Sequence, residues 1–366
     1  MSLILDGTNG ITNLTSINGG QLGGRRNIVY NGEMKVAQRS ASETGLGGAN
    51  GYFTLDRFKI GGGTTAGRFT MTQTADGPVG FANCMKLDCT TADTSIAANE
   101  YLFIRQLLEG QDVQQLKKGT ASAEQVTVSF YVKGNANATY TVELEDRDNS
   151  RYNSQEFSVT TAWNRIELIF AADTTGAFND DNAESLALNI WLHSGSTYTG
   201  GTHTDNVWHT TNNQRVGDSQ TSFYDATSRT FFITGVQMEI GATATEFEHR
   251  SFGEEMLLCK RYCNVIAPVA DEGFAIGHNR TTTTSVGIIR HNPVMRTAPS
   301  LTFSAVNAFQ VHHANTATQT SGIAAGEQST EGSTIVATVG SGLTAGQGSQ
   351  IREHTSGATI IIDAEL

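Results

Sequence analysis

Aromatic and polar side chains are concentrated in one stretch of the sequence, residues 189–217. Tyr198, His203, Trp208 and His209 lie there among Gly, Ser, Thr and Asn. Aromatic faces stack on sugar rings, while amides, hydroxyls and imidazoles hydrogen-bond to sugar hydroxyls. The stretch therefore predicts a glycan-binding loop. The alternative is a purely structural role, in which Trp208 packs the loop onto the rest of the fold.

A second group of histidines offers a rival glycan site nearer the C-terminus. His291, His312 and His313 lie among Thr and Asn in the last hundred residues. Because imidazoles and amides both hydrogen-bond to hydroxyls, this region is the other place where we expect a glycan to bind.

The sequence contains none of the catalytic signatures that we sought. There is no Gly-x-Ser-x-Gly, no Walker A motif and no His-Glu-x-x-His. Two Gly-x-Gly-x-x-Ala strings, at 61–66 and 340–345, do not open a helix after a strand and are interpreted as turns. We therefore predict no catalytic residue and no enzyme activity.

Carboxylate pairs occur at Glu143/Glu145 and at Asp180/Asp181. A glycosidase needs two carboxyl groups across a cleft, one of them with a raised pKa. Both pairs are predicted to lie in turns or on the outer face of a strand, so we expect them to be solvated. A polysaccharide depolymerase remains the less favoured hypothesis.

Metal binding is not indicated by the cysteines. The spacings at 84–89 and 259–263 are not those of a zinc site, and small buried apolar residues are the better interpretation. Residues 146–150 resemble part of a calcium loop but lack the sixth-position Gly and the closing Glu of an EF-hand. No cofactor is expected, although a structural calcium ion at this edge stays open.

Composition narrows the class of protein. The 366 residues carry a formal net charge of −12, only 16% are charged, and 39 are Gly. Nucleic-acid binding is not expected, because no basic cluster is present. No apolar run is long enough for membrane insertion, and the first ten residues do not resemble a secretory signal. Four Cys make no disulfide framework, so we expect assembly in a reducing cytoplasm.

The elements that must position these side chains are strands. Apolar residues alternate in 126–134 and in 138–146, and the turn between them predicts a hairpin. Further strands are expected at 57–62, 68–75, 100–108, 165–172, 185–194 and 229–241, with a helical turn at 111–118. Together they predict an all-β protein whose residues 27–250 form an antiparallel jelly-roll sandwich.

Three further segments flank this sandwich. Residues 1–26 place Ile11, Leu14 and Ile17 among glycines, which predicts an extended anchor that gains order only against a partner. A disordered tail is the alternative.

Residues 251–267 are expected to hold a linking helix, 251–263, because Ser251 and Glu254 form a capping box. Phe252, Met256 and two Cys are expected to form its apolar stripe.

Residues 268–366 are rich in Thr, Ala and Gly and predict a small C-terminal β domain. Its expected strands are 273–278, 284–291, 300–304, 307–313, 334–339 and 358–363.

The string FFITGVQMEIGATATEFEHRSFGEEMLLCKRYC, at 231–263, resembles a segment of tailed-bacteriophage tail fibres and related virion proteins. NIVYNGEMKVAQR at 27–39 and GYFTLDRFKI at 51–60 are similar to the opening strands of those proteins, and 101–134 to their middle. Asp6–Gly10 resembles leaders of marine phage fibres. The resemblance covers about 27–263 and only loosely the rest.

This resemblance implies a jelly roll similar to carbohydrate-binding modules, usually in a trimer, without catalytic residues. We therefore expect a homotrimeric tail fibre in the virion that adsorbs to host-surface glycan. Residues 1–26 would attach it to other virion proteins of the tail or capsid. The alternatives are a capsid fibre or decoration protein, or a tail adaptor, with no ligand.

Overall fold

The computed structural model describes residues 25–269, 271–355 and 357–366. The chain divides into two compact units, Met1–Arg250 and Ser251–Leu366. Strands dominate both, which confirms the all-β class. No helix in the described residues is long and apolar enough to cross a membrane. The anchor residues Ile11, Leu14 and Ile17 lie outside the described part of the chain.

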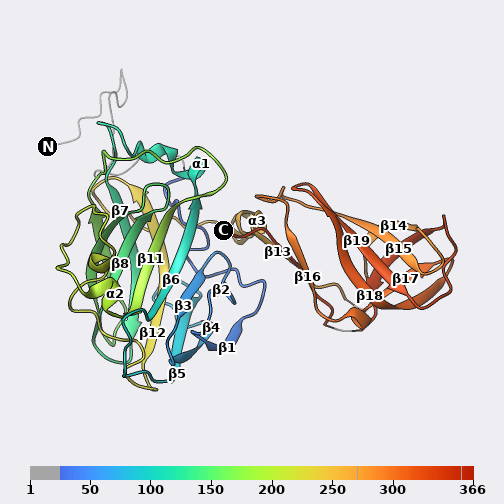
Figure 1. Ribbon diagram of the computed structural model, residues 1–366, viewed down its shortest axis with the longest axis horizontal. Coiled ribbons are helices and arrows are strands. Elements are labelled where there is room, and N and C mark those ends of the chain that lie inside the picture. The colour runs from blue at the N-terminus through green and yellow to red at the C-terminus, as the bar shows by residue number, and fades with distance from the viewer. Residues whose placement is uncertain (1–24, 270, 356) are drawn as a thin grey trace. The chain divides into compact units, whose positions relative to one another are not determined.

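The described part of the first unit is an antiparallel sandwich of two six-stranded sheets (Figure 1). The front sheet has the order β2-β3-β6-β11-β8-β9, and the back sheet the order β1-β4-β5-β12-β7-β10. The front strands are β2 (Gly51–Tyr52), β3 (Lys59–Gly63), β6 (Tyr101–Glu109), β8 (Ala138–Asp146), β9 (Arg151–Val159) and β11 (Glu184–Ser194). The back strands are β1 (Ser42–Leu46), β4 (Arg68–Thr74), β5 (Cys84–Thr91), β7 (Val126–Gly134), β10 (Asn164–Phe170) and β12 (Thr230–Ile240). Two short helices, α1 (Gly110–Val113) and α2 (Ser196–Thr199), lie in the connections.

The core lies between these sheets, because each sheet turns its alternating apolar residues inward. Phe130 of the back sheet contacts Phe157 of the front sheet with ring centroids 5.1 Å apart. Tyr140 and Phe231 make the corresponding contact at 5.5 Å. All four side chains are buried. The alternation expected at 126–134 and 138–146 is therefore confirmed as the inner face of two strands.

The predicted hairpin between 126–134 and 138–146 is wrong. β7 pairs with β10 and β12, whereas β8 pairs with β9 and β11. The turn after Gly134 carries the chain from the back sheet to the front sheet. Alternation fixes which face of a strand is apolar but not which strand is its neighbour, so the two patterns look like a hairpin in sequence.

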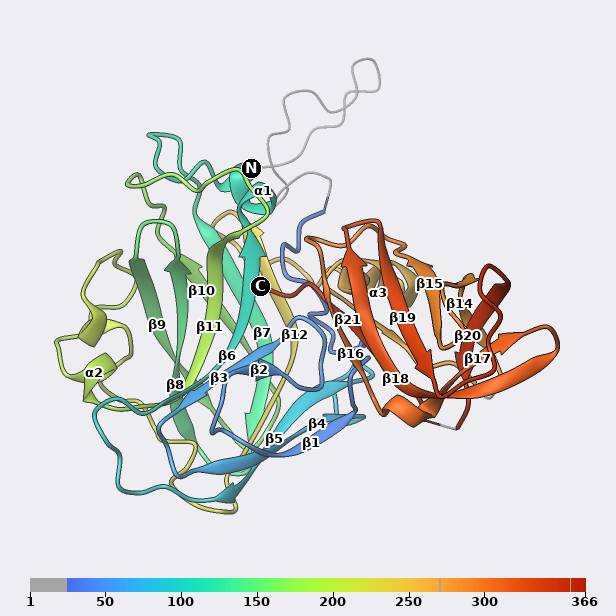
Figure 2. The same ribbon diagram turned by 45° about the vertical axis from the view of Figure 1, so that its right-hand side comes forward.

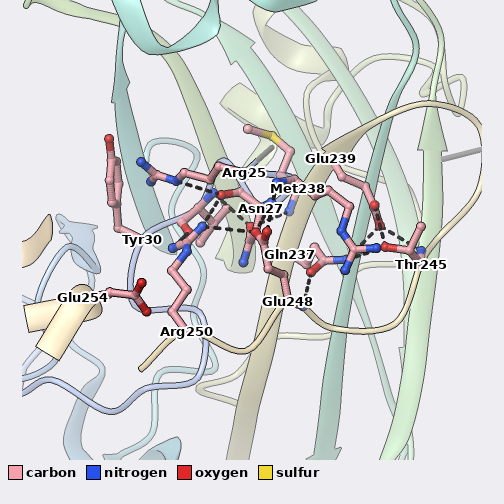
Figure 3. Close-up of polar contacts among 12 residues, drawn as sticks. Arg25, Asn27, Tyr30, Gln237, Met238, Glu239, Thr245, Glu248, Arg250 and Glu254 are labelled. Carbon is pink, nitrogen blue, oxygen red and sulfur yellow. Dashed lines mark hydrogen bonds and ion pairs between the residues drawn. The ribbon is translucent and has the colours of Figure 1, made fainter. Parts of the chain in front are cut away.

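The string at 231–250 closes the first unit against residues 25–36 through buried polar contacts (Figure 3). Asn27 accepts from the Met238 amide at 3.1 Å through Oδ1 and donates to the Val236 carbonyl at 3.1 Å through Nδ2. Glu248 accepts from the Asn27 amide at 2.7 Å, and its own amide donates to Gln237 at 2.8 Å. The polar residues of this string thus join the first described residues of the unit to its last.

The second unit begins with α3 (Phe252–Lys260), whose capping box at Ser251 and Glu254 is confirmed. The helix ends earlier than predicted, and Cys263 belongs to the strand β13 (Cys263–Ile266). The predicted apolar stripe is also wrong, because Phe252 is 55% exposed. The helix ends at Lys260 with Arg261 as its C-cap, so Cys263, the fourth residue of the predicted stripe, lies outside it.

A closed barrel and a three-stranded sheet make up the rest of the second unit (Figure 2). The barrel order is β14-β15-β19-β18-β17-β20, and the sheet order is β13-β21-β16. The barrel strands are β14 (Gly273–Asn279), β15 (Thr284–Arg290), β17 (Phe309–His313), β18 (Thr316–Gln328), β19 (Gly332–Val339) and β20 (Gly348–Glu353). The sheet adds β16 (Ser300–Phe303) and β21 (Ile360–Asp363). β18 and β20 were not predicted, because the Thr-, Ala- and Gly-rich sequence of β18 shows weak alternation and β20 has only six residues.

Candidate functional site

A pocket of about 370 Å³ opens on the outer face of the front sheet. β6 contributes Tyr101 and Phe103 to its lining, β11 contributes Trp191, and α2 contributes Tyr198. The two β6 residues are two apart, so the strand period places both on the outer face. Gly61 of the neighbouring β3 makes room for them, since a Cβ there would lie 2.0 Å from the Phe103 ring.

The four aromatic rings form a continuous wall. Tyr101 stacks on Phe103 with centroids 5.4 Å apart and planes inclined by 18°. Phe103 meets Trp191 edge to face at 4.9 Å. Tyr198 contacts Tyr101 at 5.9 Å and Trp191 at 5.1 Å. Trp191 is buried, whereas Tyr101 and Tyr198 are only partly buried, so these two rings present surface to a ligand.

A buried ionic cluster forms the polar side of the pocket. The Glu145 carboxylate contacts Arg105 at 2.6 Å, Arg147 at 2.8 Å and Arg215 at 3.0 Å. Glu143 accepts two hydrogen bonds from Arg215, at 2.7 and 2.8 Å. The paired positions of β6, β11 and β8 bring these groups together, because Asn189 faces both Arg105 and Glu143 across the sheet.

Asn189 and Trp191 complete the hydrogen bonding of the cluster. Asn189 donates to Glu143 at 2.7 Å and to Glu145 at 2.9 Å, and accepts from Arg105 Nε at 2.6 Å. The Trp191 indole N–H donates to Glu143 at 2.9 Å. Each carboxylate therefore has several donors, which is the condition under which buried charges are tolerated.

The cluster fixes the ionisation of its members. Burial alone would raise the pKa of Glu145, but the charges of Arg105, Arg215 and Arg147 outweigh it and lower the pKa to about 2. Burial would favour neutral Arg215, but the adjacent Glu143 raises the pKa of this guanidinium. A carboxyl group with so low a pKa is unsuited to act as a general acid near neutral pH.

The carboxylate pair Glu143/Glu145 was predicted to be solvated, and this is wrong: both side chains are buried. Asp180 and Asp181 are exposed as predicted. The signal available in the sequence was a charged or amide side chain within each of three strands: Arg105, Asn189 and the pair Glu143/Glu145. It could not identify the cluster, because the strand order that makes Arg105, Asn189 and Glu143 neighbours was unknown.

The predicted site residues separate in the structure. Tyr198 lines the pocket, whereas Trp208 packs against the body of the sandwich. The Trp208 indole donates to the Ala171 carbonyl at 2.7 Å, and the Lys118 ammonium lies 5.4 Å from its ring. These contacts correspond to the structural role that was the alternative for Trp208.

The two histidines of the loop fasten it to β9. His203 Nε2 lies 2.9 Å from the Ser154 hydroxyl. His209 exchanges backbone hydrogen bonds with Tyr152, and the two rings lie 5.9 Å apart. Burial lowers the pKa of His209, so neutral pH leaves this ring uncharged. His203 and His209 therefore support the pocket from its β9 side rather than lining it.

The rival histidines of the second unit are engaged locally. His291 lies 3.2 Å from the Thr330 carbonyl and 2.9 Å from the Ser333 hydroxyl. His313 is buried with Nδ1 3.3 Å from Gln347. His312 is half-buried on the same strand, β17.

The metal hypotheses find little support in the geometry. Within the described residues, no three His, Cys, Asp or Glu side chains are placed to hold a metal ion. Where the calcium loop was considered, the Lys118 ammonium contacts the Asp146 and Asp173 carboxylates and bonds two carbonyl oxygens at 2.7 Å. Burial raises the pKa of Cys84 and of Cys89 to about 11, which disfavours the thiolate that zinc requires.

Comparison with known proteins finds likeness in structure alone. No family model matches the chain, and no curated protein matches its sequence. A CBM4 module has a TM-score of 0.30 and 13% identity, covering 57% of this chain and 97% of its own. A family 11 carbohydrate-binding module of a Clostridium thermocellum cellulase has a TM-score of 0.27 and 14% identity, and the match covers 54% of this chain and 99% of the module. The enzymatically active domain of bacteriophage CBA120 tailspike protein 4 has a TM-score of 0.29 and 12% identity, and the match covers 58% of this chain and 21% of the tailspike chain. At these scores the likeness carries no inference about function, which rests on the geometry of the site.

Proposed function

We propose that the protein binds a glycan of the host surface through the pocket on the front sheet. The observation that carries this proposal is the pairing of partly exposed rings, Tyr101 and Tyr198, with fixed polar groups in one pocket of about 370 Å³. Pockets of roughly 300–1,000 Å³ with a few placed polar groups are typical of small-ligand sites. Aromatic faces give a sugar ring its apolar contact, and the polar groups orient its hydroxyls.

The ionic cluster supports this role because it is ordered before a ligand arrives. Arg105, Glu145 and Arg215 already hold one another at hydrogen-bond distance. A ligand that meets preordered groups loses less side-chain entropy on binding. Weak binding at one pocket would suffice in a multivalent assembly, since avidity multiplies affinity.

A glycan array with the purified full-length protein tests the proposal. We expect at least one glycan to bind to the native protein and to be lost from the double variant Tyr101→Ala/Tyr198→Ala. Phe232→Ala is the matched control, because Phe232 is a partly buried aromatic residue on the back sheet. Equal binding by native protein and double variant would contradict the pocket assignment.

The wider proposal places this binding in a bacteriophage virion, as a homotrimeric tail fibre attached through residues 1–26. Its support is the sequence resemblance at 27–263. Antibody labelling of purified particles distinguishes a tail fibre from a capsid fibre or an adaptor. Deleting residues 1–26 should leave the sandwich folded and prevent incorporation into particles; normal incorporation would contradict the attachment role.

We further propose that the protein does not cut the glycan it binds. Despite its burial, three guanidinium neighbours lower the pKa of Glu145 to about 2, which leaves this carboxyl group unsuited to donate a proton, and both oxygens of Glu143 accept hydrogen bonds from Arg215. Incubation with host polysaccharide should release no new reducing ends. Release of oligosaccharides that stops in Glu145→Gln would instead identify a depolymerase.

A further inference from the structure

Two guanidinium groups of the pocket keep hydrogen-bond donors that no residue in the described part of the chain accepts. Arg105 bonds through Nε and Nη2, to Asn189 and Glu145. Arg215 also bonds through Nε and Nη2, to Glu143 and Glu145. Within residues 25–269, 271–355 and 357–366, neither Nη1 has a hydrogen-bond acceptor.

These free donors belong to well-buried side chains but are not sealed from solvent. The side chain of Arg215 is 9% exposed and that of Arg105 is 13% exposed. Neither Nη1 is among the described buried polar atoms that lack a partner, so both keep some contact with solvent, and both residues line the pocket. Guanidinium donors that are largely buried and have no protein acceptor favour a ligand that supplies acceptors.

The two guanidiniums are also adjacent. Arg105 Nη2 and Arg215 Nη2 both contact one carboxylate oxygen, Glu145 Oε2, at 2.6 and 3.0 Å. Their unused Nη1 groups therefore lie within reach of one ligand. Paired guanidinium donors match the oxygens of an anionic group better than a single hydroxyl.

The charge of the lining points the same way. Four cationic side chains line the pocket, Lys59, Arg105, Arg147 and Arg215, against the two carboxylates of Glu145 and Glu184. With Glu143, which accepts two hydrogen bonds from Arg215, the excess is one positive charge, in a chain whose formal net charge is −12. A locally cationic pocket attracts anionic ligands even when the protein as a whole is acidic.

We propose that the glycan is acidic, and that its carboxylate or sulfate ester lies against Nη1 of Arg105 and Arg215 while its ring packs on Tyr101 and Tyr198. This inference rests on the proposed function and specifies its ligand class. A carboxylate and a sulfate ester both present an anionic group with several acceptor oxygens.

Calorimetric titration with a matched set of galactose-based oligosaccharides tests the inference on the native protein. The set is an oligogalacturonate, a sulfated carrageenan oligosaccharide and a neutral galacto-oligosaccharide. We expect an anionic probe to bind about tenfold more tightly than the neutral one. Its affinity should fall several-fold between about 50 mM and about 500 mM NaCl, because salt screens charge. Preference for galacturonate or for carrageenan identifies the anionic group.

Variants then locate the effect. Arg105→Gln should lower affinity for the anionic probe about tenfold and leave the neutral probe almost unchanged, with Arg105→Lys intermediate. Lys86→Gln is the control, because it removes one positive charge from the back sheet. Salt-independent binding that prefers the neutral probe would overturn the inference and leave the proposed function standing. Binding of no glycan, here and on the array, would overturn both.

Discussion

Glu145 links three guanidiniums and shows how single residues set the charge of the pocket. Its folded pKa of about 2 lies below the unfolded value, so its contribution to stability is complete above about pH 4.5 and is lost as pH falls towards 2. A shift of this size corresponds to about 3 kcal/mol. We expect urea unfolding to show a free energy that declines over this range.

The variant Glu145→Gln should be less stable than the native protein near pH 7 by about 3 kcal/mol, since it leaves buried guanidiniums without their partner. The difference should narrow as the pH approaches 3. Glu184→Gln, whose carboxylate is 34% exposed, should cost much less. A pH-independent difference for Glu145→Gln would show that Glu145 does not titrate as the geometry requires.

Trp208 and Tyr198 lie in the same loop and should respond differently to truncation. Trp208→Ala removes a hydrogen bond and packing on the sandwich, so we expect a loss of about 2–3 kcal/mol of stability with glycan binding retained. Tyr198→Ala should weaken glycan binding at a smaller cost in stability. Melting curves and glycan titrations on both variants check this pair. Loss of glycan binding in Trp208→Ala, at an unchanged melting temperature, would instead place the glycan site in the polar loop of residues 189–217.

Lys118 supplies the positive charge at the place where calcium was considered. Lys118→Met should destabilise the sandwich by about 3 kcal/mol or more, because Asp146 and Asp173 would lose their buried partner. EDTA removes metal ions but not the Lys118 ammonium, so it should leave the melting temperature of the native protein unchanged. A lower melting temperature in EDTA, restored by Ca²⁺, would contradict this account.

At the scale of elements, close strand approach constrains the barrel of the second unit. A Cβ at Gly277 would lie 1.7 Å from the Val286 carbonyl oxygen on the neighbouring strand. Gly277→Ala must therefore separate β14 from β15, and we expect it to cost several kcal/mol. Gly340→Ala is the matched control, because no atom lies within 4 Å of the position of its Cβ. Equal thermal stability of the two variants would contradict the packing at Gly277.

The positions of most strands in the first unit were predictable from the sequence, but their pairing was not. Most predicted strands of the first unit exist, because alternation reports a buried face directly, as in Val126–Gly134. Their pairing was not predictable, because β7 pairs with β10 and β12 rather than with the next strand, and β8 pairs with the distant β11 as well as with the adjacent β9. Most residues of the pocket could not be predicted for the same reason. Tyr198 could be recognised by its setting, whereas Arg105 and Glu145 become neighbours only in the folded sheet.

For the whole molecule, a homotrimer remains a prediction. The apolar C-terminal strand does not require a partner subunit, because β21 pairs with β13 and β16 within the chain, and Ile360 and Ile362 are fully buried. The prediction rests on the sequence resemblance at 27–263. Sedimentation of the full-length protein should give a mass near three chains of 39.1 kDa. A monomer at micromolar concentration would contradict it.

The most direct test of the central claim is diffraction from crystals of the full-length protein soaked with the glycan that the array selects. We predict density for a sugar ring against Tyr101 and Tyr198 on the front sheet, with polar contacts to Arg105 or Arg215. Density beside Trp208, or at His291 and His312 in the second unit, with the front-sheet pocket empty, would contradict it.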